Sequence, residues 1–188
     1  MLRFLLILLI SNFCNPAFSS VKEKIISQMR LTNILRFNFI QTINKKIENG
    51  SCLIKYPKKI FCEYVGTDKK IMISNGKSLV IKIKNSGNYY IYPLKKTPLE
   101  LLLDKEYLIS KINILDVRSV NDKYLSFKIF ENHNEINIFF DKNNFNLVGW
   151  QTEDIYQNLS ITFISSIKIN EEIDEKIFIL PPNDWLIT

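Results

Sequence analysis

The chain has 188 residues, of which 46% are hydrophobic and 12% aromatic, and its formal net charge is +6 at pH 7. This composition is that of one globular domain, and it excludes a disordered chain or a multi-span membrane protein. The basic residues are scattered along the chain rather than clustered. They therefore predict a solvated exterior, with weak attraction to anionic membranes as the alternative, and no nucleic-acid site.

The N-terminus predicts export. Arg3 precedes an apolar run over residues 4–10, and small residues at 17 and 19 fit a cleavage site. The run is too short to span a bilayer. We expect a signal peptide over residues 1–19, cleaved near Ser19, and one mature domain over residues 20–188; an uncleaved anchor is the alternative. The bulky Phe13 before Cys14 argues against lipid attachment at that cysteine.

The mature chain begins with a predicted amphipathic helix. Ser20 and Glu23 have the spacing of a capping box, and Val21, Ile25 and Met29 fall on one helical face. A second, short helix is predicted over residues 97–103, with Thr97 as its cap and Glu100 closing a second capping box. Its leucines make it apolar nearly all round, so it must be buried or cover a cavity.

Strands are predicted for most of the remaining chain. Apolar residues alternate with polar ones from Leu35 to Phe39, and Asn75-Gly76 predicts a hairpin between two further alternating runs. Later strands are expected at residues 112–120, 124–130, 135–140, 147–152 and 159–170. Ten or eleven strands with two helices predict a mainly β, α+β fold. Its single curved antiparallel sheet forms an incomplete barrel with the helices as a lid.

Two cysteines remain in the mature domain, Cys52 and Cys62, on either side of a predicted hairpin turn containing Pro57. A three-residue turn would place them opposite each other, within reach of a disulfide, whereas a two-residue turn would not. The alternative is a pair of small buried apolar side chains.

Several segments in this order resemble the LolA family of lipoprotein carrier proteins. The resemblance spans nearly all of the mature domain. The segments that carry it are the N-terminal helix leading to Phe39-Ile-Gln41, then residues 50–57, 61–64, 73–76 and 97–103, and finally Phe140-Asp141, residues 147–150 and Asp154.

The resemblance implies a periplasmic protein that shields acyl chains. Members of the family accept triacylated lipoproteins from an ATP-driven inner-membrane transporter of the ABC type. They deliver this cargo to an outer-membrane acceptor or to the outer membrane itself. A monomer without a cofactor is expected. The family usually has an arginine latching the lid before the proline of the second strand, but Tyr56 stands there. Tyr56 is therefore the candidate latch. The flanking Lys55, Lys58 and Lys59 lack the planar fork of arginine.

One face of each predicted strand supplies the candidate acyl-chain cavity. Its residues are Phe37, Phe39, Leu53, Ile71, Ile73, Leu79, Ile81, Tyr90, Tyr92, Ile138, Phe140, Trp150, Ile161 and Phe163. The lid candidates are Ile25, Met29, Leu101 and Leu102. The alternative for each residue is ordinary core packing, and a one-residue slip would invert a whole strand.

No catalytic or metal site is predicted. His133 is the one histidine and lies in a polar segment, and the two mature cysteines lack Cys-x-x-Cys spacing. No nucleophile elbow or phosphate-binding glycine loop is present. The alternatives to a carrier are an outer-membrane lipoprotein acceptor or a lipid-binding sensor on a related half-barrel. A periplasmic hydrolase with an apolar pocket is the alternative from another class.

Overall fold

The computed structural model describes residues 20–66, 69–131, 134–153 and 158–180. Its main element is one antiparallel sheet of eleven strands. The strands are β1 (Ile34–Ile43), β2 (Lys46–Lys55), β3 (Lys59–Val65), β4 (Lys70–Asn75), β5 (Ser78–Ile83), β6 (Tyr89–Pro93), β7 (Arg118–Val120), β8 (Tyr124–Glu131), β9 (Asn134–Asp141), β10 (Leu147–Glu153) and β11 (Leu159–Ile169). The predicted fold class is confirmed. The predicted leader over 1–19, Cys14, His133 and Asp154 lie outside the described residues.

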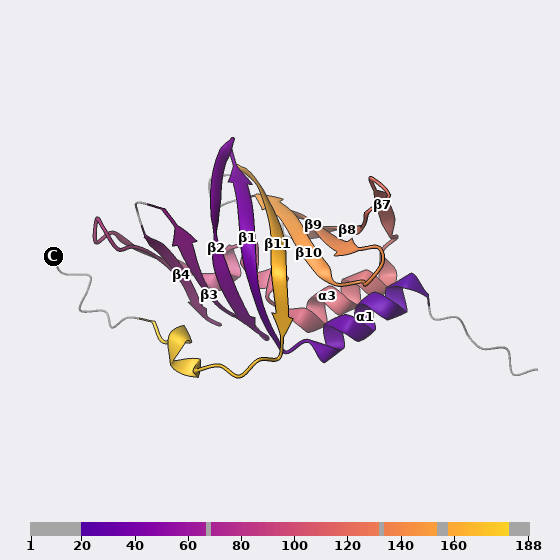
Figure 1. The fold of residues 1–188 in the computed structure, drawn as a ribbon, viewed down its shortest axis with the longest axis horizontal. Helices are drawn as coiled ribbons and strands as arrows, with labels where there is room; N and C mark the ends of the chain where they lie inside the picture. The colour runs from indigo at the N-terminus through magenta and orange to yellow at the C-terminus, as the bar shows by residue number, and fades with distance from the viewer. Residues whose placement is uncertain (1–19, 67–68, 132–133, 154–157, 181–188) are drawn as a thin grey trace, which may run out of the picture.

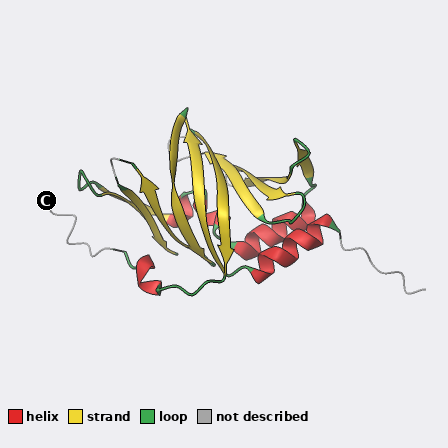
Figure 2. Ribbon diagram, in the orientation of Figure 1, coloured by secondary structure: helices red, strands yellow, loops and turns green. Residues whose placement is uncertain are grey.

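The sheet stays open because its two edge strands do not pair. Its order is β6-β5-β4-β3-β2-β1-β11-β10-β9-β8-β7, so paired strands are consecutive in the sequence except at the β1–β11 junction, and the consecutive strands β6 and β7 lie at opposite edges. The sheet curves strongly around its inner face, as the ribbon views show (Figures 1 and 2). The chain between the two edges, β6 and β7, contains the helices α2 (Leu99–Leu102) and α3 (Lys105–Ile114), preceded by the short 3-10 turn η1 (Leu94–Lys96).

The first helix, α1 (Val21–Leu31), begins with the predicted capping box. The hydroxyl of Ser20 accepts a hydrogen bond from the Glu23 amide at 3.2 Å, and the Glu23 carboxylate accepts one from the Ser20 amide at 2.6 Å. The helix packs against α3, and the two lie side by side in Figure 1. Their buried side chains close one end of the half-barrel.

The prediction of a strand over residues 112–120 is wrong for most of its length. Residues up to Ile114 belong to α3, and β7 begins only at Arg118. The side chain of Asp104 caps α3 by accepting from the Tyr107 amide at 3.1 Å. Leu108 and Ile112, four residues apart, are buried on one face of the helix.

The second predicted helix exists as α2, but its predicted cap is wrong. Pro98 occupies the N-cap position and makes no side-chain cap. The hydroxyl of Thr97 instead donates to the carbonyl oxygen of Leu94 at 2.8 Å. Thr97 therefore closes the preceding 3-10 turn, which fixes where the chain leaves the edge strand β6.

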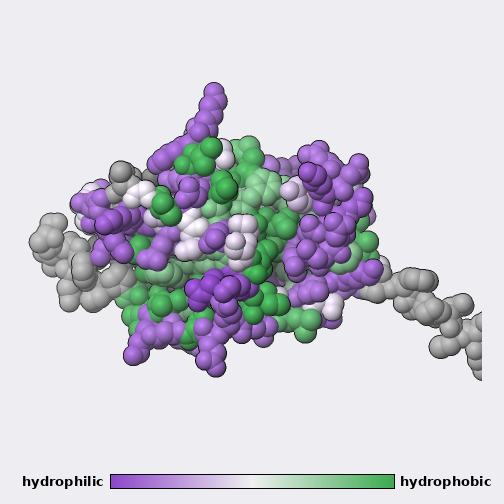
Figure 3. Space-filling model, viewed as in Figure 1, coloured by the Kyte–Doolittle hydropathy of each residue, from purple (hydrophilic) through white to green (hydrophobic). Residues whose placement is uncertain are grey.

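The two faces of the sheet are set by alternation along the strands, with register shifts at Arg36–Asn38 and Leu147–Gly149. Phe37, Phe127, Ile138 and Phe140 point inward and are almost completely buried in one cluster with residues of the helices. The outer face is mixed. Figure 3 shows hydrophobic residues interrupting its hydrophilic surface over the central strands, where Phe163 is 44% exposed.

A second apolar layer covers part of the outer face. Leu53, Phe61, Ile73 and Val80 lie opposite one another on β2 to β5, facing away from the barrel interior. Leu53 and Val80 are nevertheless only 2% and 0% exposed. The C-terminal 3-10 turn η2 (Glu175–Phe178) contacts β3 and β4 on this side, and its Phe178 is buried. We infer that η2 shields this outer row from water.

Candidate functional site

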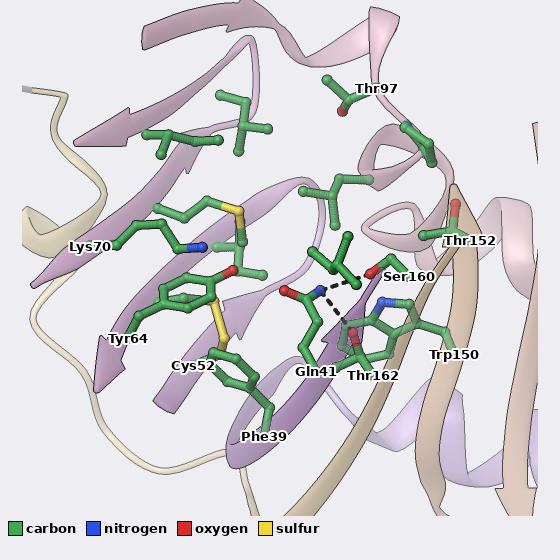
Figure 4. A pocket seen from close by; sticks show the side chains of 18 of the residues that line it. Phe39, Gln41, Cys52, Tyr64, Lys70, Thr97, Trp150, Thr152, Ser160 and Thr162 are labelled. Carbon is green, nitrogen blue, oxygen red and sulfur yellow. Dashed lines mark hydrogen bonds between the residues drawn. A yellow bond between two sulfur atoms is a disulfide. The ribbon is translucent and has the colours of Figure 1, made fainter. Parts of the chain in front are cut away.

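The inner face of the sheet and the start of α2 enclose a cavity of about 380 Å³, called here the main cavity. Figure 4 shows its lining side chains pointing inward from the surrounding strands and from the segment before α2. The lining residues are Phe37, Phe39, Gln41, Ile43, Cys52, Ile60, Cys62, Tyr64, Lys70, Met72, Leu79, Ile81, Tyr90, Tyr92, Thr97, Pro98, Leu99, Trp150, Thr152, Ser160 and Thr162.

Aromatic side chains give the cavity a firm apolar wall. Phe37 meets Trp150 edge-on, with 6.1 Å between ring centres, and Phe39 meets Tyr64 edge-on at 4.9 Å. The second pair depends on Gly50, which lies between Phe39 and Tyr64 in the register of β1, β2 and β3. A Cβ atom at Gly50 would lie 2.9 Å from the Phe39 ring and collide with the backbone oxygen of Glu63. Glycine is therefore required there.

A disulfide forms part of the same wall. Cys52 and Cys62 are direct partners across β2 and β3, with 4.1 Å between their Cα atoms, and their sulfur atoms are bonded. The register places Lys55 opposite Lys59, so the turn has three residues, Tyr56 to Lys58. This is the turn length that brings the two cysteines face to face. The bond fixes the spacing of two cavity-lining strands.

One side of the main cavity is polar. The amide nitrogen of Gln41 donates to the hydroxyls of Ser160 at 3.1 Å and Thr162 at 3.0 Å. Across the cavity, the ammonium of Lys70 lies 3.8 Å from the centre of the Tyr64 ring and pairs with Glu48.

The surroundings of Glu48 and Tyr64, beside Lys70, fix the protonation states of these two groups. Burial raises the pKa of Glu48, but hydrogen bonds from Lys70 and Lys46 lower it more, so the net shift is downward and the carboxylate is charged. Burial, with the nearby Glu48 charge, raises the pKa of Tyr64 far above its ordinary value. At neutral pH the phenol of Tyr64 is therefore a neutral hydrogen-bond donor.

The structure brings together only some of the predicted cavity residues. Those that line the main cavity are Phe37, Phe39, Leu79, Ile81, Tyr90, Tyr92 and Trp150. Ile138 and Phe140 are on the inner face but are packed in the core, with exposed fractions of 0%.

The remaining predictions chose the wrong face of their strands. Leu53, Ile71, Ile73, Ile161 and Phe163 point outward, and the inward positions belong to their neighbours. On β4 the inward residue is Met72, and on β11 the inward residues are Ser160 and Thr162. Both faces of β2 and β4 carry apolar side chains, so alternation alone did not distinguish inside from outside, and on β11 the polar residues are the inward ones.

The predicted lid residues lie around the main cavity rather than on its surface. Ile25 and Leu102 are buried in the core, and Leu101 packs against it. Met29 lines a separate cavity of about 40 Å³ between α1, α3 and the sheet. The helical part of the main cavity wall comes from Pro98 and Leu99, at the start of α2.

Lys58 makes a polar connection between the sheet and the helical cover. Its ammonium lies 2.7 Å from the Glu100 carboxylate of α2 and 3.4 Å from Asp104, the cap of α3. Its backbone amide also donates to the carbonyl oxygen of Leu103 at 2.8 Å. The hydrogen bond to Glu100 is the largest contribution raising the pKa of Lys58, although desolvation opposes it.

Tyr56, the candidate latch, is placed differently. Its ring packs against the core and lines both small cavities beneath the helices. Burial raises its pKa to about 12. Its hydroxyl makes no hydrogen bond to any part of the chain that the structure describes, whereas its backbone amide donates to Asn33 at 2.9 Å. A hydroxyl latch at Tyr56 therefore has no contact to support it, and its ring acts as packing.

Two absences hold for the described residues. No group of three or more histidine, cysteine, aspartate or glutamate side chains is placed to hold a metal ion. Within the same residues, no helix combines the length and apolar character needed to cross a membrane.

An open, curved antiparallel sheet with a covered apolar cavity places the chain in the class of half-barrel binding proteins. The sequence matches the family described as "Outer membrane lipoprotein carrier protein LolA" over residues 30–180. The chain belongs to this family, whose members are periplasmic binding proteins that act on lipoproteins or lipids. No curated protein matches the sequence.

Solved structures align with this chain at low sequence identity. An uncharacterised conserved protein from Thermus thermophilus aligns with a TM-score of 0.52 at 7% identity, over 86% of this chain and 95% of that one. A LolA superfamily protein from Nitrosomonas europaea aligns at 0.44 and 13% identity, over 85% and 96% of the two chains. A putative outer membrane lipoprotein-sorting protein domain from Vibrio parahaemolyticus aligns at 0.47 and 7%, over 85% and 97%.

Proposed function

We propose that this protein is a periplasmic carrier for lipoproteins. It holds their acyl chains after release from the inner membrane by an ABC-type transporter and delivers them to an acceptor or to the outer membrane. The observation that carries the proposal is the main cavity, whose lining is mainly aromatic and aliphatic. Such a surface is suited to hydrocarbon, because burying each methylene releases about 0.8 kcal/mol.

The size and cover of the cavity suit reversible binding. A volume of about 380 Å³ is near the lower end for ligand pockets. Accommodating several acyl chains therefore requires α2 to move away from the sheet. That movement breaks the ion pairs of Lys58 with Glu100 and Asp104. The cost of opening offsets part of the binding free energy, so that cargo can be released.

The proposal is tested by mass spectrometry of the protein isolated from the periplasm, first native and then denatured. We expect triacylated lipoproteins to remain bound in the native spectrum and to separate on denaturation. Free lipid without lipoprotein would contradict the carrier function and support a lipid-binding sensor. A protein that is empty, and that takes up no purified lipoprotein from detergent, would refute the proposal.

Two substitutions locate the binding surface. Ile81→Asp places a charge in the main cavity and is expected to abolish acyl-chain binding. Ile71→Asp makes the same change on the neighbouring strand but on the outer face. This variant is expected to bind cargo as the unmodified protein does. Equal cargo transfer by both variants would place the acyl chains elsewhere.

A further inference from the structure

The inner face of the sheet has a polar strip in an otherwise apolar cavity. It consists of Gln41 on β1, Thr152 on β10, and Ser160 and Thr162 on β11. Thr162 and Ser160 are 2% and 3% exposed. A hydrocarbon chain gains nothing from these groups, and burying polar groups costs free energy unless each is hydrogen-bonded. A cavity that served hydrocarbon alone would have apolar residues at these positions.

On β11 the usual placement of apolar and polar residues is reversed at the strip. Ile161 and Phe163 point outward, while Ser160 and Thr162 point into the cavity. In a sheet with one solvated face, apolar residues normally face inward and polar residues outward. The reversal affects only this end of β11, since Ile164 is again buried in the core.

The hydrogen bonds within the strip orient its amide group. Because the nitrogen of Gln41 donates to both Ser160 and Thr162, the amide oxygen is directed toward the opposite wall (Figure 4). Tyr64 approaches from that wall, and its hydroxyl lies at the cavity surface beside Lys70. Among the described residues, neither the Gln41 oxygen nor the Tyr64 hydroxyl has a hydrogen-bond partner. The cavity thus presents one acceptor and one donor from opposite walls.

The charge balance at this end is suited to neutral ligand groups. The ammonium of Lys70 is already paired with Glu48, and Glu48 also pairs with Lys46 at 3.0 Å. A phosphate entering here would meet the Glu48 carboxylate together with the lysines. Ester and amide carbonyls are strong acceptors without charge, and an amide N–H is a donor.

We propose that the polar strip, with Tyr64, binds the ester and amide groups that join acyl chains to the rest of an acylated ligand. The Tyr64 hydroxyl donates to a carbonyl oxygen of the ligand, and the Gln41 oxygen accepts from its N-acyl amide. The cavity then recognises the linkage region as well as the chain length. This inference rests on the proposed function, because it requires acyl chains in the main cavity.

The test compares two synthetic lipopeptides that differ only in the glyceryl linkage. One carries ester-linked chains and the other ether-linked chains, so only the two carbonyl groups are removed. Dissociation constants are measured by displacement of a fluorescent hydrophobic probe. The unmodified protein is expected to prefer the ester ligand by about three- to tenfold, as for the loss of one or two hydrogen bonds. Equal affinity for both would overturn the inference.

The variants assign the preference to the strip. Tyr64→Phe removes the donor and is expected to abolish the ester preference, by lowering the affinity for the ester ligand to that for the ether ligand. A second comparison uses an N-acylated lipopeptide and the same peptide without its N-acyl chain. Gln41→Leu is expected to reduce the affinity advantage of the N-acylated peptide, because the amide N–H loses its acceptor, whereas Gln151→Leu is expected to keep the full advantage. Gln151 is a matched control, since it lies on the outer face of β10. Unchanged preferences in Tyr64→Phe and Gln41→Leu would overturn the inference.

Two outcomes separate this inference from the carrier function. If neither lipopeptide binds the unmodified protein, the proposed function fails and the inference fails with it. If both bind equally, acyl-chain binding stands and only linkage recognition is refuted. A diacyl phospholipid serves as a third ligand. An equal loss of its affinity in Tyr64→Phe would support carbonyl recognition with a membrane lipid as the source. Circular dichroism and binding of the ether ligand establish that each variant is folded.

Discussion

The ammonium group of Lys58, in the turn between β2 and β3, lies 2.7 Å from the Glu100 carboxylate at the start of the helical cover. This contact joins the sheet wall to α2, the segment that we propose moves when the cavity enlarges. Lys58 lies two positions after Tyr56, and it is at the position of Tyr56 that the LolA family usually has an arginine. The ammonium of Lys58 contacts two carboxylates, those of Glu100 and Asp104.

Lys58→Met should loosen the cover without unfolding the sheet. The ion pairs are partly exposed, so we expect the free energy of unfolding to fall by about 1 kcal/mol or less. Binding of a hydrophobic dye to the cavity should become faster, as measured by stopped-flow fluorescence. Lys123→Met, at an exposed lysine in another turn, is the matched control. Identical dye-binding rates in the two variants would show that Lys58 does not hold the cover.

Removing the disulfide should weaken the wall of the cavity. For two cysteines with a sequence separation of 10, a cross-link typically contributes about 3 kcal/mol to stability. The double variant Cys52→Ala, Cys62→Ala should therefore unfold at a lower urea concentration, and its free energy of unfolding should be lower by roughly this amount. The unmodified protein under reducing conditions should match it. A denaturation midpoint that is the same with and without the bond would contradict the prediction.

Alkaline pH should destabilise the protein through two tyrosines. Burial raises the pKa of Tyr56 to about 12, and burial with the Glu131 carboxylate raises the pKa of Tyr107 to about 12. The folded state therefore holds these protons more tightly than the unfolded chain. Stability should fall as pH rises from about 10 toward 12. Absorbance titration should show a late step that shrinks in Tyr56→Phe and in Tyr107→Phe. Its persistence in both variants would refute the assignment.

Phe178→Ala should release the C-terminal turn without unfolding the sheet. Phe178 is 3% exposed, and the ammonium of Lys59 lies 5.8 Å from its ring centre. Because η2 packs only from the outer side, we expect a smaller loss than the about 3–5 kcal/mol of a central phenylalanine. Hydrogen exchange should accelerate around η2 and on the outer row of β3 and β4. Phe127→Ala, in the main core, should instead lower protection throughout the sheet.

The sequence predicted the architecture well because antiparallel strands and tight turns have local sequence patterns. The alternation at Phe37 and Phe39 and the Asn75-Gly76 turn each have a local cause, and both appear as predicted. Helix α3 was missed because Ile109, Ile112 and Ile114 favour strands, while its signals were the Asp104 cap and the four-residue spacing of Leu108 and Ile112.

The site was predicted only in part, for two physical reasons. The C-terminal η2 covers an outer row of the sheet, so the outward residues Leu53 and Ile73 are apolar, like the residues that line the cavity. No local sequence pattern reveals which face of the sheet η2 covers. On β11 the usual rule is inverted, with Thr162 inside and Phe163 outside. Departures of this kind are expected where a surface serves a ligand rather than the core.

The junction between β1 and β11 determines the order in which the fold can be completed. The amide of Asn33 donates to the side chain of Asn170, 137 positions later, while β1 to β6 can pair with near neighbours as soon as they are available. Contacts of such long range slow folding, because the ends of a long chain must meet first. The first strand of the sheet therefore keeps one unsatisfied edge until the last strand arrives. We expect the newly made chain to remain open along its centre, and in need of protection from aggregation, until its last strand has been synthesised.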